Sequence, residues 1–137
     1  MANRFFIIDG NARFRSTLKS MLQDEWKDAV VDEFDPPSQG WPGEDVDWPS
    51  YDLLFIEQDL KGDSGLEWFV VLSGQGRFPP TIILSARPDP EVAVKAIKAG
   101  VENYLPKKTL SPQKLREAVE EILGQPRAAP PVTEPPP

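Results

Sequence analysis

Residues 51–65 read YDLLFIEQDLKGDSG, in which a short apolar run gives way to acids and glycines. The apolar part, residues 53–56, shows no alternation of polar and apolar side chains. This is typical of a strand that is buried on both faces of a parallel sheet. The polar residues that follow indicate a loop at the carboxyl end of the strand, where open α/β sheets bind their ligands.

Four further strands are expected, two before and two after this run in the sequence, and most are separated by stretches with helical periodicity. They are residues 5–8, 29–31, 81–84 and 101–105. Asn11, Asp89 and Ser111 are suited to cap the starts of helices, and Gly100 and Gly124 are suited to end them. The alternation of strands and helices predicts a doubly wound parallel sheet with helices on both faces.

Residues 32–50 interrupt this pattern. They contain four prolines, two glycines and six acidic residues, and no Lys or Arg. Because Pro and Gly break long helices, we expect a loop with at most one helical turn, so that the second helix is replaced or shortened. Trp41 and Trp48 are expected to fold back over the sheet, and the alternative is an exposed patch for a partner.

The last residues differ in composition from the rest of the chain. From Pro126 onward, 6 of 12 residues are proline, which favours an extended linker over a packed core. We therefore predict one domain over residues 1–124, followed by a proline-rich tail or linker over residues 125–137.

The composition excludes several kinds of function. The chain has no Cys and no His, so thiolate chemistry and the commonest general base are both absent. The net charge of −7 disfavours direct binding of nucleic acid. No apolar run is long enough to cross a membrane and the N-terminus does not resemble a signal peptide, so a cytoplasmic protein is expected.

Polar residues follow four of the predicted strands. They are Asp9 after the first, where Gly10 follows, Glu57 and Asp59 after the third, Ser85 after the fourth and Lys107 after the fifth. The carboxyl ends of parallel strands meet at one edge of the sheet, so we expect these groups to converge. Carboxylate oxygens suit Mg²⁺, whereas lysine and serine suit phosphate oxygens.

The order and spacing of these residues resemble the receiver domains of bacterial response regulators. The resemblance rests on Asp9, on Gly65 eight residues after Glu57, on Ser85-Ala86, and on Tyr104 and Lys107. It implies a flavodoxin-like five-stranded sheet of order 2-1-3-4-5. It also implies that Ser85, Tyr104 and Lys107 form the phosphate-reading switch, and that Asp9, Glu57 and Asp59 form the metal site.

Several positions depart from the family pattern. Glu57 stands where the family has the phosphoaccepting Asp, and Gly10 replaces the second acid of the metal site. Lys61 and Lys108 replace two prolines. We therefore expect a receiver that is not an enzyme, requires no cofactor, binds Mg²⁺ weakly at most, and signals independently of phosphorylation. In such a receiver, Glu57 either partly imitates the phosphorylated residue by reaching Lys107 and Ser85, or the site is silent. The alternative is a working phosphoacceptor that uses Asp59 or Glu57 with Mg²⁺.

The resemblance also implies the partners of the domain. They would be a sensor kinase and an output domain or protein, and residues 89–124 could form a homodimer. An unrelated small enzyme on a flavodoxin-like fold is a further alternative, although the chain lacks His, Cys and a glycine-rich phosphate loop.

Overall fold

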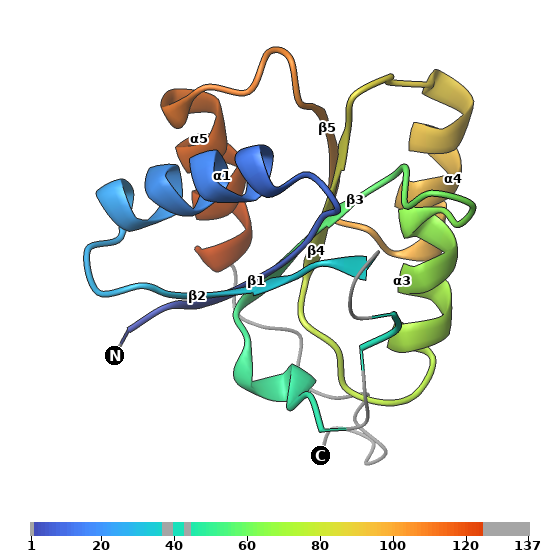
Figure 1. The fold of residues 1–137 in the computed structure, drawn as a ribbon, viewed down its shortest axis with the longest axis horizontal. Coiled ribbons are helices and arrows are strands. Elements are labelled where there is room, and N and C mark those ends of the chain that lie inside the picture. Colours follow the sequence, from blue (N-terminus) through green and yellow to red (C-terminus); the bar gives the residue numbers. More distant parts are fainter. Residues whose placement is uncertain (1, 37–39, 43–44, 125–137) are drawn as a thin grey trace, which may run out of the picture.

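The computed structural model describes residues 2–36, 40–42 and 45–124 of the chain. These residues form a five-stranded parallel sheet of order β2-β1-β3-β4-β5, with helices on both faces (Figure 1). The elements are β1 (Arg4–Ile8), α1 (Ala12–Glu25), β2 (Val30–Phe34), the 3₁₀ helix η1 (Trp48–Ser50), β3 (Leu53–Glu57), α3 (Gly65–Ser73), β4 (Thr81–Ser85), α4 (Pro90–Ala99), β5 (Asn103–Pro106) and α5 (Pro112–Leu123). The predicted fold and strand order are therefore confirmed.

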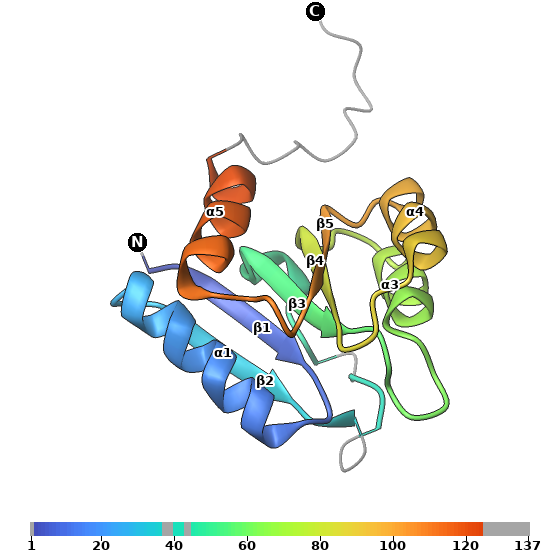
Figure 2. The same cartoon turned by 90° about the horizontal axis from the view of Figure 1, so that it is seen from above.

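The sheet separates two hydrophobic layers. Helices α1 and α5 cover one face, and α3 and α4 cover the other (Figure 2). Alternate residues of each central strand enter opposite layers. In β1, Phe5 lies in the α1 and α5 layer and Phe6 in the α3 and α4 layer, and both are buried. This double burial explains why the central strands are largely apolar.

The predicted helix boundaries follow from their caps. The side chains of Asn11, Asp89 and Ser111 each accept a hydrogen bond from a backbone N–H in the first turn of the following helix. Gly100 ends α4 with a φ of 108°, a left-handed conformation that glycine adopts without the steric cost of a Cβ. The caps predicted from the sequence at these positions are confirmed.

Two strand boundaries differ from the prediction. Strand β2 continues to Phe34, through the start of the expected loop, because Asp32 and Glu33 pair in register with Phe6 and Ile7. As an edge strand, β2 leaves acidic side chains room to reach polar partners, and Tyr51 donates a hydrogen bond to Asp32 at 2.6 Å. Strand β5 starts at Asn103, two residues later than expected.

The connection between β2 and β3 includes residues 37–39 and 43–44, which lie outside the described residues, as does the predicted tail over residues 125–137. Of the described residues in this connection, Pro36 is helical and Trp48–Ser50 form η1. Trp48 covers the sheet as predicted, because its ring lies edge-on to Phe6 with the centroids 5.0 Å apart. Trp41 stacks on Trp68 at 4.2 Å but remains 46% exposed.

Candidate functional site

Three charged side chains meet at the carboxyl edge of the sheet. Lys107 Nζ lies 2.8 Å from Asp9 Oδ2 and 2.7 Å from Glu57 Oε1. Asp9 follows β1, Glu57 ends β3, and Lys107 follows β5, so the three reach one point from separate strands. The structure thereby confirms the predicted convergence of these residues, and it gives the lysine two carboxylate partners.

Asp9 is buried to 1% exposure and held from several sides. Its Oδ1 accepts a hydrogen bond from the Asn11 N–H at 2.8 Å, and its backbone carbonyl accepts one from Arg15 Nη1 at 2.6 Å. Burying a carboxylate is costly unless it is paired and hydrogen-bonded. Lys107 and the Asn11 amide meet this requirement, and they fix the position of the carboxylate.

The end of β3 is fixed by a close approach of the next helix. A Cβ added to Gly65 would lie 2.2 Å from the carbonyl oxygen of Glu57, which is closer than any real Cβ contact. Glycine at this position allows the start of α3 to pack directly on the backbone of Glu57. The Gly65 N–H also donates to the carbonyl of Gln58 at 2.8 Å, so β3, the following loop and α3 are joined as one unit.

The pKa of Glu57 is raised to about 7, mainly by burial and also by the hydrogen bond with Asp9 and the negative charge of Asp9. Lys107 acts in the opposite direction and limits the rise. One ammonium thus serves two carboxylates, and the fold favours the protonated form of Glu57 relative to the unfolded chain.

This pKa predicts that Glu57 contributes a fall in stability with rising pH, and that Glu57→Gln removes this contribution. Between the ordinary pKa of 4.5 and the folded value of about 7, folded Glu57 keeps a proton that the unfolded chain has released. Stability contributed by Glu57 is therefore present below pH 4.5 and is lost as the pH rises toward 7. Urea denaturation at pH 5 and pH 8 should show a smaller loss for E57Q than for the wild type. Equal losses would contradict the assignment.

The two other predicted switch residues, Ser85 and Tyr104, are positioned by their own neighbours. Ser85 is buried at the end of β4, and its hydroxyl accepts a hydrogen bond from the Arg87 N–H at 3.2 Å. Tyr104 is half-buried, and its hydroxyl accepts one from the Asp89 N–H at 3.3 Å. Among the hydrogen bonds of the described residues, neither hydroxyl is joined to Glu57 or Lys107.

The predicted metal ligands are only partly brought together. Asp9 and Glu57 meet at Lys107, but Asp59 is exposed in the loop after β3, where it pairs with Ser64 through a β-bridge. Gly10 supplies no side-chain ligand. Within the described part of the chain, no group of three acidic side chains could hold a metal ion. The ammonium of Lys107 lies beside both carboxylates, so a Mg²⁺ ion would compete with it for the same oxygen atoms.

Sequence reasoning missed two residues that shape the site, Phe14 and Arg15 in the first turns of α1. Lys107 Nζ lies 4.3 Å from the centre of the Phe14 ring, within the range of a cation–π contact. Arg15 contacts Glu33 of β2 at 3.2 Å as well as the Asp9 carbonyl. Both residues lie about one turn after the cap at Asn11, and this spacing could have indicated that their side chains lie beside the strand ends.

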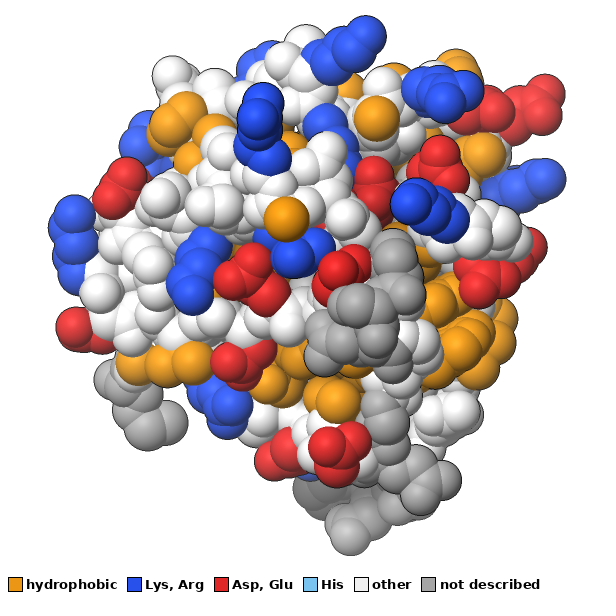
Figure 3. Space-filling model, viewed as in Figure 1, with side chains coloured by type: hydrophobic (Ala, Val, Ile, Leu, Met, Phe, Trp, Pro, Cys, Tyr) orange, Lys and Arg blue, Asp and Glu red, His pale blue; other side chains and the backbone are white. Residues whose placement is uncertain are grey.

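The surface around these elements is mixed in charge. Acidic and basic side chains lie side by side over the face shown in Figure 3, without one large patch of a single sign. Among the described residues, no helix is both long and apolar enough to cross a membrane.

Comparison with known proteins identifies what this arrangement is similar to. Residues 5–120 match the family model of the response regulator receiver domain. The response regulator RppA of Synechocystis is 32% identical over 104 residues, which are 76% of this chain and 44% of RppA. The phosphate regulon transcriptional regulatory protein PhoB of Klebsiella pneumoniae is 25% identical over 90% of this chain and 52% of PhoB. The chain spans about half the length of these two relatives.

Solved structures show the same fold. A response regulator receiver protein from Pseudoalteromonas atlantica superposes with a TM-score of 0.72 at 23% identity, covering 88% of this chain and 97% of that one. The BeF₃-activated DrrB receiver domain gives a TM-score of 0.74 at 19% identity, with 91% and 100% covered. Together with the family match over residues 5–120, the parallel sheet and the cluster of Asp9, Glu57 and Lys107 show that the chain belongs to the response regulator receiver domain family.

Proposed function

We propose that this receiver module acts in two-component signal transduction through protein–protein contacts, without phosphorylation of Glu57. The observation that carries the proposal is the double engagement of Lys107, which lies 2.8 Å from Asp9 and 2.7 Å from Glu57. The lysine that would otherwise contact a phosphoryl group is already held by the side chains of Asp9 and Glu57.

The chemistry of the site supports the same conclusion. Glu is one methylene longer than Asp, so its carboxylate is displaced by roughly 1–1.5 Å from the position of an Asp carboxylate. In-line phosphoryl transfer depends on positioning and on neutralisation of charge, and a displacement of this size costs about 100-fold in rate. The missing acid at Gly10 weakens metal binding and acts in the same direction.

The contacts of the switch residues bear on whether Glu57 imitates a phosphorylated residue. Glu57 makes the contact with Lys107 that a phosphoryl group would make, but the Ser85 hydroxyl is bonded to the Arg87 N–H. Only one of the two expected contacts is present. We therefore favour a silent site, held in one state, over a complete mimic of the phosphorylated form.

The surface for partners is proposed to be the α4, β5 and α5 region, residues 89–124. Val94 and Ile97 on α4 are 54% and 50% exposed, and two exposed apolar side chains on one helix suit a protein interface. A sensor kinase, an output domain or a second copy of the chain are the partners that we propose for it. The net charge of −7 argues against direct contact with nucleic acid.

Acetyl phosphate with Mg²⁺, followed by intact mass measurement, tests the proposal. The wild type should show no added phosphoryl group. The double variant Gly10→Asp with Glu57→Asp restores both acids of the family pattern and should gain an acid-stable, base-labile adduct, which makes it the matched positive control. A phosphoryl adduct mapped to Glu57 or Asp59 of the wild type would overturn the proposal and favour a working phosphoacceptor.

A further inference from the structure

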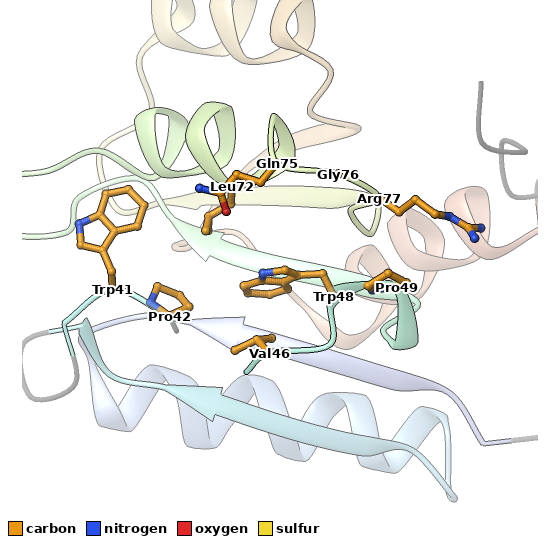
Figure 4. A pocket seen from close by; sticks show the side chains of 9 residues that line it. All are labelled: Trp41, Pro42, Val46, Trp48, Pro49, Leu72, Gln75, Gly76 and Arg77. Atoms are coloured by element: carbon orange, nitrogen blue, oxygen red, sulfur yellow. The ribbon is translucent and has the colours of Figure 1, made fainter. Parts of the chain in front are cut away.

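A groove of about 640 Å³ lies beside α3, and none of its lining residues belongs to the charged cluster of Asp9, Glu57 and Lys107. Its walls include Trp41 and Trp48 from the connection between β2 and β3, and Leu72 near the end of α3. Figure 4 shows Trp41 at one end of the groove and Pro49 and Arg77 at the other. On the face shown in Figure 3, hydrophobic side chains gather where Figure 1 places α3.

The aromatic walls of the groove are held in place by the core. Trp48 lies 5.0 Å from Phe6 and 4.9 Å from Phe78, measured between ring centroids. Trp41 lies flat on buried Trp68, with the rings 17° from parallel. One face of Trp41 is thus supported while 46% of the residue is exposed. Two supported aromatic rings form a pre-organised surface, so little conformational entropy is lost when a ligand binds.

A groove of this kind suits one class of ligand. Proline-rich segments in the polyproline II conformation dock in aromatic-lined grooves, because the segment is already extended and its rings pack on aromatic faces. The chain itself carries a proline-rich segment. Residues 125–137 include six prolines, Pro126, Pro130, Pro131, Pro135, Pro136 and Pro137.

The segment leaves the domain at a suitable place. In a parallel α/β sheet, the helices run antiparallel to the strands. Helix α5 therefore ends at the edge of the sheet where the strands begin. Pro49 and Arg77 precede β3 and β4 and lie at this same edge. Thirteen residues in the polyproline II conformation extend about 40 Å. A domain of this length has a radius of gyration of about 14 Å, so the segment can pass from Gly124 around the edge into the groove.

We propose that residues 125–137 dock in cis into the groove between Trp41 and Trp48. Attachment to α5 gives the segment a millimolar effective concentration, so even a weak affinity fills the groove. Docking covers the exposed ring of Trp41, so other proline-rich ligands would compete with the tail for the groove. The inference does not depend on the state of Glu57, and it stands or falls separately from the proposed function.

A spin label on the tail tests the contact in the full chain. The chain has no Cys, so Thr133→Cys provides a unique attachment point. The NMR signals of the Trp41 and Trp48 indole N–H groups should be lost through relaxation by the label. Trp26 packs on Phe5 on the opposite face of the sheet, so its signal should persist as the internal control.

Two further samples make the result specific. Replacing Pro130, Pro131 and Pro135 with alanine in the labelled chain removes the polyproline II preference and should restore both signals. In a mixed sample, the spin label is placed on chains at natural isotope abundance, and the observed ¹⁵N-enriched chains carry no spin label. The indole signals of the ¹⁵N-enriched chains should then be unchanged. Equal, weak broadening of all indole signals in the spin-labelled chain would overturn the proposal. Loss of the Trp41 and Trp48 signals in the mixed sample would also overturn it, because a second copy of the chain would then fill the groove.

Discussion

Replacing Lys107 with alanine is expected to lower the free energy of unfolding by about 3 kcal/mol at pH 8, the typical cost of leaving a buried charge without its partner. Lys107 is the cation shared by Asp9 and Glu57, whose side chains are 2% and 12% exposed. Without the ammonium, two carboxylates face each other in a site that water reaches poorly. Urea denaturation of Lys107→Ala against the wild type measures the loss.

Lys108→Ala is the matched control, since Lys108 is exposed and adjacent in the chain, and it should change stability little. The double variant Lys107→Ala with Glu57→Gln should recover part of the loss, because only one buried charge remains. This coupling between the two substitutions separates an electrostatic role of Lys107 from a packing role. A stability of Lys107→Ala within a few tenths of a kcal/mol of the wild type would show that the charged cluster does not exist as described.

Replacing Gly65 with alanine is expected to cost about 3 kcal/mol, at the upper end of the usual range for overpacking. The added methyl group would lie 2.2 Å from the carbonyl oxygen of Glu57 and 2.9 Å from its carbonyl carbon. Both are backbone atoms at the end of a buried strand, so no side-chain rotation relieves the clash. Either β3 or the start of α3 must move, and the Glu57 carboxylate moves with the strand.

Ser73→Ala in the same helix provides the control, because it also introduces alanine into α3 without a new contact at the strand end. Thermal unfolding should show a clear decrease in melting temperature for Gly65→Ala and little change for Ser73→Ala. The amide signals of Glu57 and Lys107 should shift in Gly65→Ala alone. Normal stability of Gly65→Ala would mean that α3 is not anchored on β3 as the structure describes.

The sequence was sufficient to predict the fold because each central strand carries its own signal. An apolar run such as residues 53–56 belongs inside a parallel sheet, and helix caps at Asn11, Asp89 and Ser111 mark the crossovers. The edge strand β2 was the exception. Asp32 and Glu33 are polar, so the pattern suggested a loop, whereas pairing with β1 and contacts from Tyr51 and Arg15 hold them in a strand.

The site was predictable as a set of residues but not as a set of contacts. Strand ends converge in any parallel sheet, and this placed Asp9, Glu57 and Lys107 together. Which partner Lys107 contacts depends on side-chain reach, and the extra methylene of Glu57 allows a 2.7 Å contact. The hydrogen bond of the Ser85 hydroxyl with the Arg87 N–H depends on the local turn after β4, which composition does not specify. The contact of Arg15 with the Asp9 carbonyl depends on how α1 packs beside β1, which the sequence pattern does not specify.

The most direct measurement of the central claim is a set of amide NMR spectra of the chain alone, with Mg²⁺, and with Mg²⁺ plus beryllium fluoride as an analogue of the phosphoryl group. If Asp9 and Glu57 already neutralise Lys107 and the site does not read phosphate, the three spectra should be the same. Shifts at Asp9, Glu57, Ser85 and Lys107 that spread to Tyr104 would contradict the claim and show a phosphate switch that still works.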